Sequence, residues 1–182
     1  DIVSADKRAG DIIQGLRALL KKGEFRRDSL DLNEVVFEVL KLMHSDLLNA
    51  GVEVSTDLTE TLPLVQGDRV QLQQILINLV VNGCEAMSDL READRKLVIA
   101  TTVSADGGVC VRVSDRGRGV PPDDLDRVFE PFVTSKSEGL GMGLAVCRNI
   151  VAAHKGRLWA SNNVAGGASF FFTLPSSLRQ VA

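Results

Sequence analysis

Apolar residues near the start of the chain recur at alternating intervals of three and four positions. The residues that form this seam are Ile2, Ala5, Ala9, Ile12, Leu16 and Leu19. Such spacing is typical of a helix in a coiled coil or bundle, because one helix cannot bury the seam alone. We therefore predict that residues 1–22 form a coiled-coil-like helix, separate from a domain that spans 23–182. The alternative is an ordinary amphipathic helix packed on its own domain.

Three further segments have the apolar periodicity of helices, at about 33–50, 68–92 and 142–155. Asp31 or Asn33 is predicted to cap the first helix and Asp68 the second, while Gly156 is expected to end the third. The predicted core residues of the first helix are Val35, Val36, Val39, Leu40, Met43, Leu47 and Leu48.

Alternating apolar and polar residues predict strands between these helices. The predicted strands cover about 28–32, 52–58, 96–104, 110–114, 157–163 and 168–174. Glycine-containing turns at 106–108 and 165–167 join two pairs of them as hairpins, and 63–67 is predicted to be a loop. Three helices packed on one mixed sheet make an α/β fold, a two-layer sandwich.

Composition is that of a globular protein, with 45% hydrophobic and 25% charged residues among 182. The net charge of −3 predicts no general affinity for nucleic acid. No apolar run is long enough to cross a bilayer, so we predict no membrane contact by this segment. The chain starts at Asp1 without Met, as expected of part of a longer protein. Cys84, Cys110 and Cys147 are predicted to be buried, reduced thiols, as in a cytoplasmic protein.

A glycine cluster follows the predicted strand at 110–114. Asp115 stands at the end of that strand, where its carboxylate can accept a hydrogen bond from an exocyclic amino group such as that of adenine. Gly117 and Gly119 lack Cβ and can take positive φ, so the backbone can turn tightly beside a flat ring. Taken alone, Asp-x-Gly-x-Gly is often a plain turn.

A second cluster, Gly139, Gly141 and Gly143, leads into the helix that starts near Leu144. Free backbone N–H groups at the start of a helix can bind phosphate, and Lys136 just upstream can add a mobile positive charge. The cluster has neither the spacing of a dinucleotide fingerprint nor the Gly-Lys-Ser/Thr of a P-loop.

Two asparagines stand out on the strongly apolar helix at 68–92. Asn78 and Asn82 are four residues apart, so they share one face. Either they bond to neighbouring backbone, or one amide oxygen binds Mg²⁺, a cation that favours oxygen ligands and substrate phosphates.

Four motifs in this order resemble those of sensor histidine kinases, in the ATPase superfamily that includes gyrase and the heat-shock chaperones. The N box is Gln74 to Met87, the first glycine box Asp115 to Gly119, the F box Phe129 to Phe132, and the second glycine box Gly139 to Leu144. The match covers roughly 28–175, and the short Phe-Val-Thr-Ser-Lys lid resembles that of nitrogen-regulation and oxygen-sensing kinases.

The resemblance implies a role for each matching residue. Asn82 would coordinate Mg²⁺, Asn78 would assist catalysis near the phosphates, and Asp115 would bind the adenine amino group. The remaining nucleotide-binding residues would be Gly117, Gly119, Val120, Lys136, Gly139, Gly141, Gly143 and Leu144, with Lys136 also catalytic. Val120 would form an apolar wall of the base pocket, and the last three glycines would hinge the lid.

The resemblance also implies cofactors and partners. ATP with Mg²⁺ would supply a γ-phosphoryl group to a histidine on a dimerisation helix absent from this chain, for relay to an aspartate of a response regulator receiver domain. The full-length protein would be a homodimer, and residues 1–22 would end its second hairpin helix. His44 lies in the first helix of the ATP-binding domain and is not expected to be the acceptor, and for His154 a favourable charge–dipole interaction at a helix end suffices.

Two other classes of function are weighed against this one. A hydrolytic ATPase clamp would carry a glutamate base where this chain has Asn78, so water activation is poorly supported. A nucleotide-binding module without turnover is disfavoured by the intact glycine boxes and both asparagines. Turnover with an added histidine-bearing hairpin would separate these possibilities.

Overall fold

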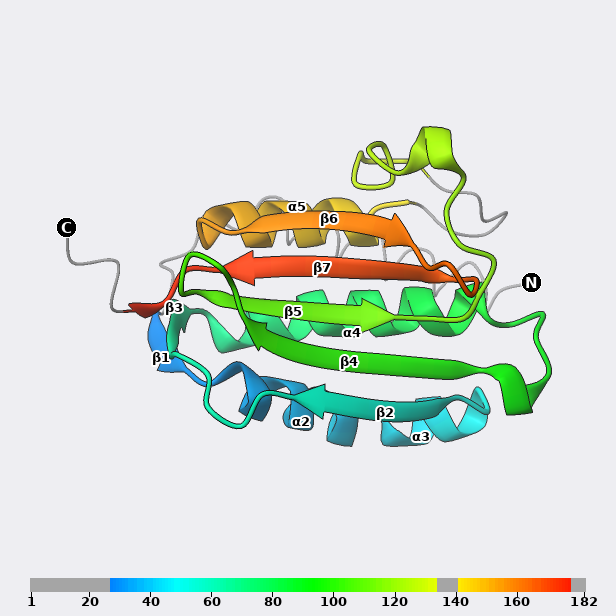
Figure 1. Cartoon of the computed structure of the whole chain (residues 1–182), viewed down its shortest axis with the longest axis horizontal. Coiled ribbons are helices and arrows are strands. Elements are labelled where there is room, and N and C mark those ends of the chain that lie inside the picture. The colour runs from blue at the N-terminus through cyan, green and yellow to red at the C-terminus, as the bar shows by residue number, and fades with distance from the viewer. Residues whose placement is uncertain (1–26, 134–140, 178–182) are drawn as a thin grey trace, which may run out of the picture.

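The computed structural model of the protein describes residues 27–133 and 141–177. The predicted helix at 1–22 lies outside the described residues and stays a prediction, and so do the positions of Lys136 and Gly139. The described chain forms two layers, with a sheet in front of a layer of helices in the view of Figure 1. The predicted two-layer α/β sandwich is therefore confirmed.

The main sheet has five strands in the order β2-β4-β5-β7-β6. Their bounds are Glu53–Leu58 for β2, Lys96–Val103 for β4, Val109–Ser114 for β5, Ala168–Leu174 for β7 and Arg157–Asn162 for β6. β2 runs parallel to β4, and the other neighbouring pairs are antiparallel, so the sheet is mixed as predicted. Both predicted hairpins, β4–β5 and β6–β7, are present.

In the described part of the chain, four helices lie against one face of this sheet, as Figure 1 shows. They are α2 (Leu32–Leu42), α3 (His44–Asn49), α4 (Arg69–Ala86) and α5 (Gly143–Ala153), and short 3-10 turns lie at Glu92–Asp94 and Pro122–Asp124. Their apolar faces meet the inward-facing strand residues in one core, in which Leu72, Ile75, Leu97, Ile99 and Phe172 are at most 1% exposed. Burial of this apolar surface is the main force that holds the two layers together.

The helix predicted at 33–50 is divided in two at Met43, whose backbone leaves the helical region with φ −89° and ψ 4°. Five of the seven predicted core residues are buried and Leu40 is partly buried, but Leu48 is 66% exposed, so that prediction is wrong. A break in the helix changes the angular phase of the residues after it. Leu47 therefore keeps its place in the core while Leu48 points to solvent.

A second, two-stranded sheet was not predicted. β1 (Asp28–Leu30) pairs antiparallel with β3 (Val65–Gly67), so the loop predicted at 63–67 is partly a strand. Val65 and Leu30 are both buried in the common core. This pairing brings the chain to the start of α4, where Asp68 caps the helix by accepting a hydrogen bond from the Gln71 N–H at 3.1 Å, as predicted.

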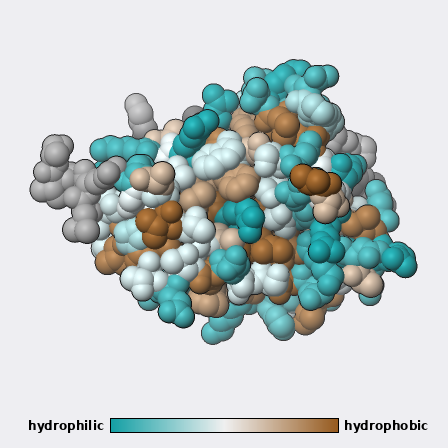
Figure 2. All heavy atoms as spheres, viewed as in Figure 1, coloured by the Kyte–Doolittle hydropathy of each residue, from teal (hydrophilic) through white to brown (hydrophobic). Residues whose placement is uncertain are grey.

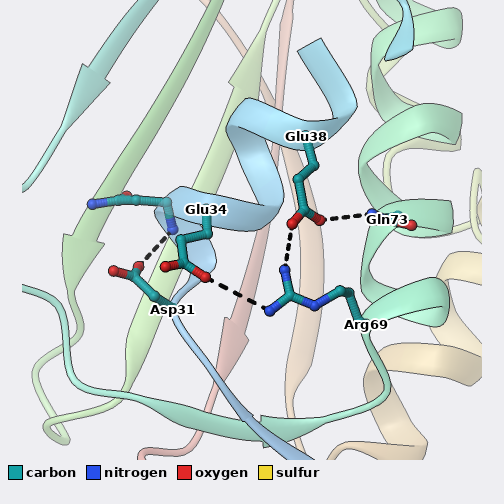
Figure 3. Close-up of polar contacts among 6 residues, drawn as sticks. Asp31, Glu34, Glu38, Arg69 and Gln73 are labelled. Atoms are coloured by element: carbon teal, nitrogen blue, oxygen red, sulfur yellow. Dashed lines mark hydrogen bonds and ion pairs between the residues drawn. The ribbon is translucent and has the colours of Figure 1, made fainter. Parts of the chain in front are cut away.

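The first turn of α4 is also tied to α2 by exposed polar contacts (Figure 3). Arg69 lies 2.6 Å from a Glu38 carboxylate oxygen and 3.6 Å from Glu34, and the Gln73 amide donates to Glu38 at 2.8 Å. Exposed ion pairs contribute little stability, so these contacts mainly fix how the two helices lie side by side.

α4 ends at Ala86 rather than near residue 92 as predicted. The guanidinium of Arg95 donates to the carbonyl oxygens of Leu90, Ala50 and Ser88 at 2.9, 2.7 and 3.0 Å. The bonds to Ser88 and Leu90 satisfy backbone acceptors in the irregular turn after α4, and the bond to Ala50 satisfies one at the end of α3. The Ala86 carbonyl oxygen, at the end of α4, lies next to Gly117 in the segment that follows β5.

The sheet face opposite the helices carries mixed polar and apolar side chains (Figure 2). Trp159 stacks on its cross-strand neighbour Phe171 with ring centroids 5.2 Å apart, and Arg157 lies 5.5 Å from the Trp159 ring. Within the described ranges no helix is both long and apolar enough to span a membrane.

Candidate functional site

The predicted motifs meet along one side of α4. Near the middle of α4, the Asn78 side-chain amide donates a hydrogen bond of 3.1 Å to the carbonyl oxygen of Gly143, which is the first residue of α5. One turn further, a methyl group added at Gly83 would lie 3.5 Å from the Asp115 Cβ. At the end of the helix, a methyl group added at Gly117 would lie 2.4 Å from the Ala86 carbonyl oxygen. The N box thus contacts both glycine boxes.

Asn78 is held on both sides of its amide. Its oxygen accepts a hydrogen bond from the Gln74 side chain at 2.9 Å, and its nitrogen donates to Gly143 and lies 3.6 Å from the Cys147 sulfur. The amide is therefore fixed in orientation, with α5 docked against it. Asn82 follows one turn later on the same face and is half-buried, so the two asparagines share a surface as predicted.

The N-terminus of α5 lacks the cap that α2 and α4 possess. Asp31 and Asp68 accept hydrogen bonds from the first turns of α2 and α4, whereas Met142 at the start of α5 offers no side-chain cap and the first turn has no acidic residue. Backbone N–H groups of the first helical turn have no intrahelical acceptor. Within the described residues no side chain caps them, so they could bind an anion, and Gly143 and Leu144 belong to this turn.

Asp115 lies just beyond β5 and is 4% exposed. Its Oδ1 accepts hydrogen bonds from the N–H groups of Gly117 at 2.8 Å and Ala168 at 3.3 Å. Burial raises the pKa of the Asp115 carboxyl, and these N–H donors lower it only in part. Within the described ranges Oδ2 has no hydrogen-bond donor, so one carboxylate oxygen remains to receive a donor from a ligand.

The two glycines after Asp115 serve different purposes. Gly119 has φ +73°, a conformation that L side chains rarely adopt, as the sequence predicted. Gly117 does not have positive φ, and a side chain there is excluded by the nearby Ala86 carbonyl. Val120 is partly buried against the core. A hollow of about 450 Å³ beside it is lined by Arg118, Gly119, Val120, Pro121, Pro122 and Asn162.

The second glycine box is described only in part. Gly141 has φ +64°, and its carbonyl oxygen accepts a hydrogen bond from the Phe132 N–H at 3.2 Å, while Phe129 packs edge-on against Phe170. Gly143 lacks positive φ, and among the described residues an added methyl group would meet only the Asn78 side chain, at 3.8 Å. Its local geometry therefore does not require a glycine. Gly139, Leu140 and Lys136 lie outside the described residues, whereas Met142 is buried and Leu144 is partly buried against the core.

The two histidines do not join the site. His44 is exposed at the first residue of α3. His154 is buried, and its Nε2 accepts from the Asp68 N–H at 3.1 Å while Nδ1 faces the Ile150 carbonyl oxygen at 2.8 Å. These hydrogen bonds link α5 to the start of α4, a contact that the predicted charge–dipole role for His154 does not include.

The cysteines are free thiols with different environments. Cys147 is fully buried beside Asn78, and burial raises its pKa to about 12. Cys84 and Cys110 are only half-buried, which corrects the prediction that all three are buried, and burial raises their pKa values too. Raised pKa values keep thiols protonated and unreactive near neutral pH.

Sequence reasoning missed the residues that hold the first glycine box from the other side. Asn162 and Asn163, at the end of β6, contact Val120 and Asp115, and Gly167 packs on the Asp115 backbone. Two asparagines before a Gly-Gly turn have ordinary turn composition, so no local signal distinguishes them. A second hollow, of about 420 Å³ between α5 and β6, is lined by none of the predicted site residues.

Comparison with protein families places residues 67–178 in a single family model, described as histidine kinase-, DNA gyrase B-, and HSP90-like ATPase. The chain is 39% identical over 170 residues to the sensor protein FixL of Bradyrhizobium diazoefficiens, covering 93% of this chain and 33% of that protein. It is 37% identical over 177 residues to the sensor histidine kinase TmoS of Ectopseudomonas mendocina, covering 97% and 18%. The chain thus spans a third or less of these relatives.

Solved structures that resemble this chain include histidine kinases. Full-length ShkA in complex with AMPPNP matches with a TM-score of 0.78 and 28% identity, over 93% of this chain and 35% of that chain. The histidine kinase ThkA in complex with the response regulator protein TrrA matches with a TM-score of 0.78 and 26% identity, over 98% and 50%. The catalytic domain of ThkA alone matches at 0.71 and 30% identity, over 85% of this chain and 99% of that domain.

Proposed function

The chain belongs to the family of histidine kinase-, DNA gyrase B-, and HSP90-like ATPases, and from this premise we propose that it is the Mg-ATP-binding catalytic domain of a sensor histidine kinase. It would transfer the γ-phosphoryl group of ATP to a histidine on a dimerisation helix absent from this chain. ShkA, a structural neighbour, was solved with the ATP analogue AMPPNP, which supports ATP as the ligand.

The observation that carries the proposal is the order of contacts along α4. Asn78 holds the start of α5, Gly83 lies beside Asp115, and Ala86 lies beside Gly117. Eight residues at a rise of about 1.5 Å separate the two ends of this strip by about 12 Å. A helix start that could bind an anion therefore lies at one end, and the buried carboxylate acceptor Asp115 lies beside Gly83, about 7.5 Å further along α4. Triphosphate and adenine have these complementary properties at opposite ends of one molecule.

The oxygen ligands that α4 can offer suit a magnesium ion that binds together with the nucleotide. No group of three His, Cys, Asp or Glu residues in the described part of the chain could hold a metal unaided. Mg²⁺ commonly takes one or two protein oxygens together with substrate phosphates and water. We assign the protein oxygen to the Asn82 amide, which lies between the two ends of the strip. When bound, the ion would neutralise charge on the phosphates.

Catalysis would depend on positioning and charge, as in other phosphoryl transfers. Asp115 orients the base, and the first turn of α5 holds phosphate oxygens. Asn78 acts through Gly143, because its amide fixes where that turn lies. Lys136 would bring its positive charge to the transferred group. A neutral imidazole nitrogen of the acceptor histidine would then attack the γ-phosphorus in line, and ADP would leave.

The partners follow from the same proposal. A response regulator receiver domain would take the phosphoryl group onto an aspartate, and the complex of ThkA with TrrA supports a partner of this kind. Residues 1–22 would end the second helix of the dimerisation hairpin and make the full-length protein a homodimer. A cytoplasmic location stays a prediction.

Replacing Asn82 with alanine is expected to weaken Mg-ATP binding about tenfold or more and to leave adenosine binding unchanged. The physical reason is the loss of a metal-ligand oxygen, which adenosine does not use. Titration calorimetry with Mg-ATP, ATP in EDTA, and adenosine would measure this. Asn149→Ala removes an exposed helical asparagine outside the site and serves as the control. Equal weakening of Mg-ATP and adenosine would make Asn82 a structural residue.

A further inference from the structure

The β6–β7 hairpin contacts the segment after Asp115 through one side chain that makes two hydrogen bonds. The Asn162 amide nitrogen donates to the Val120 carbonyl oxygen at 2.6 Å, and the Asn162 amide oxygen accepts from the Val120 N–H at 2.8 Å. The side chain therefore pairs with both polar groups of a single residue, as a neighbouring strand would. Asn162 thereby holds the residue that directly follows the first glycine box.

Gly119 is shaped to accept this contact. A methyl group added at Gly119 would lie 2.8 Å from the Asn162 side-chain oxygen, and its φ of +73° turns the chain so that Val120 presents its backbone to the hairpin. The hollow of about 450 Å³ lined by Gly119 and Val120 includes Asn162 in its wall. Asn162 thus holds the backbone of the segment that follows Asp115 from the side of the β6–β7 hairpin.

The next residue of the hairpin anchors the other end of the same segment. The Asn163 amide donates to the Asp115 carbonyl oxygen at 3.0 Å and to the Ser114 hydroxyl at 3.1 Å, and its oxygen accepts from the Ser169 hydroxyl at 2.6 Å. Gly167, at φ +85°, lies so close to Asp115 that a methyl group there would be 2.0 Å from the Asp115 carbonyl oxygen. The hairpin therefore holds both ends of 115–120.

We propose that Asn162 is a positioning residue for the base end of the nucleotide site: it fixes the Gly119–Val120 backbone in the conformation that receives adenine. The proposal rests on the proposed function and adds a residue outside the four motifs. Asn162 is exposed and contributes little to the core, so its two bonds serve the loop rather than the fold. Without them, 117–121 would populate other conformations, and apparent affinity falls with the fraction of competent molecules.

Asn162→Ala removes both hydrogen bonds. The variant is expected to bind ADP and adenosine with affinities lowered by the same factor, about tenfold, which corresponds to the loss of one or two neutral hydrogen bonds. Competition by Mg-tripolyphosphate, which occupies only the phosphate end, should not change. Asn162→Asp keeps the acceptor for the Val120 N–H but turns an oxygen toward the Val120 carbonyl, so it should also weaken ADP. Val164→Ala, at the exposed tip of the same hairpin, is the matched control.

Hydrogen exchange of the Val120 amide in the ligand-free protein gives a readout that does not need nucleotide. Exchange should be faster in Asn162→Ala than in wild type, with an unchanged melting temperature. If Asn162→Ala exchanges the Val120 amide faster but binds ADP as tightly as wild type does, the positioning role is wrong. It is also wrong if the variant loses as much affinity for tripolyphosphate as for ADP. A wild-type protein that binds no ADP would instead refute the proposed function, and the inference with it.

Discussion

Replacing Asp115 with asparagine is expected to lower ADP affinity roughly ten- to hundredfold. The variant keeps an oxygen for the Gly117 and Ala168 N–H groups, but its amide nitrogen then faces the adenine amino group, donor against donor. A hydrogen bond to a charged group contributes about 1.5–3 kcal/mol, which sets the expected loss. Titration calorimetry with ADP would measure it, with Asp57→Asn on the edge strand β2 as the control.

The same substitution should not destabilise the ligand-free fold at neutral pH. Burial raises the pKa of Asp115, so the folded chain holds this proton more tightly than the unfolded chain does. The wild-type contribution to stability therefore falls as pH rises from the unfolded pKa of about 3.9 through the raised folded pKa. The neutral amide of the variant would be free of this penalty, so the melting temperature of Asp115→Asn relative to wild type should be higher at pH 7.5 than at pH 4.

These two measurements together identify the role of the carboxylate. A folded variant with wild-type ADP affinity would refute base recognition by Asp115. A variant that melts much lower than wild type at pH 7.5 would show instead that the charge supports the fold. A binding residue is expected to give a variant that loses ADP affinity but keeps its stability, because residues that serve binding commonly lower the stability of the fold.

Replacing Gly117 with alanine is expected to destabilise the protein by about 1–3 kcal/mol and to abolish measurable ADP binding. The new methyl group would lie 2.4 Å from the Ala86 carbonyl oxygen and 2.8 Å from the Ala86 side chain, so the segment must move away from α4. That movement would break the bond from the Gly117 N–H to Asp115 Oδ1. Urea unfolding and ADP titration would report the two effects.

Gly143→Ala is the matched control, because it makes the same chemical change in the other glycine box. Its methyl group would lie 3.8 Å from Asn78, at ordinary contact distance, in the first turn of a helix. Stability should be unchanged or higher by up to about 1 kcal/mol, since alanine favours helix more than glycine does. Equal stability of Gly117→Ala and wild type would contradict the close packing of the first glycine box on α4.

Local patterns predicted most of the fold because most elements here are specified locally. The strands at the centre of the sheet alternate in polarity, both hairpins have glycine turns, and Asp31 and Asp68 stand where α2 and α4 begin. The misses have non-local causes. β3 is only three residues long and exists through its pairing with β1. The end of α4 depends on Arg95, nine residues beyond Ala86, which binds carbonyl groups in two separate turns.

The candidate site was predictable where its residues are unusual for their local structure. Asn78 and Asn82 are poor helix formers on an apolar helix, and Asp115 ends a strand within a glycine cluster. Asn162 carried no such signal, because asparagine before a turn is ordinary and its partner is 42 residues away. His154 was assigned to its own helix end, whereas its Nε2 accepts from the backbone of Asp68, 86 residues earlier.

The measurement that tests the central claim most directly is phosphoryl transfer from ATP labelled at the γ position. The chain would be incubated with Mg-ATP alone, and then with the separately made histidine-bearing dimerisation hairpin from the same gene. We predict acid-labile label on the hairpin only, absent from a hairpin whose acceptor histidine is replaced by alanine. Stoichiometric label on this chain itself, lost on His44→Ala, would contradict the account, because the acceptor would then lie within the domain.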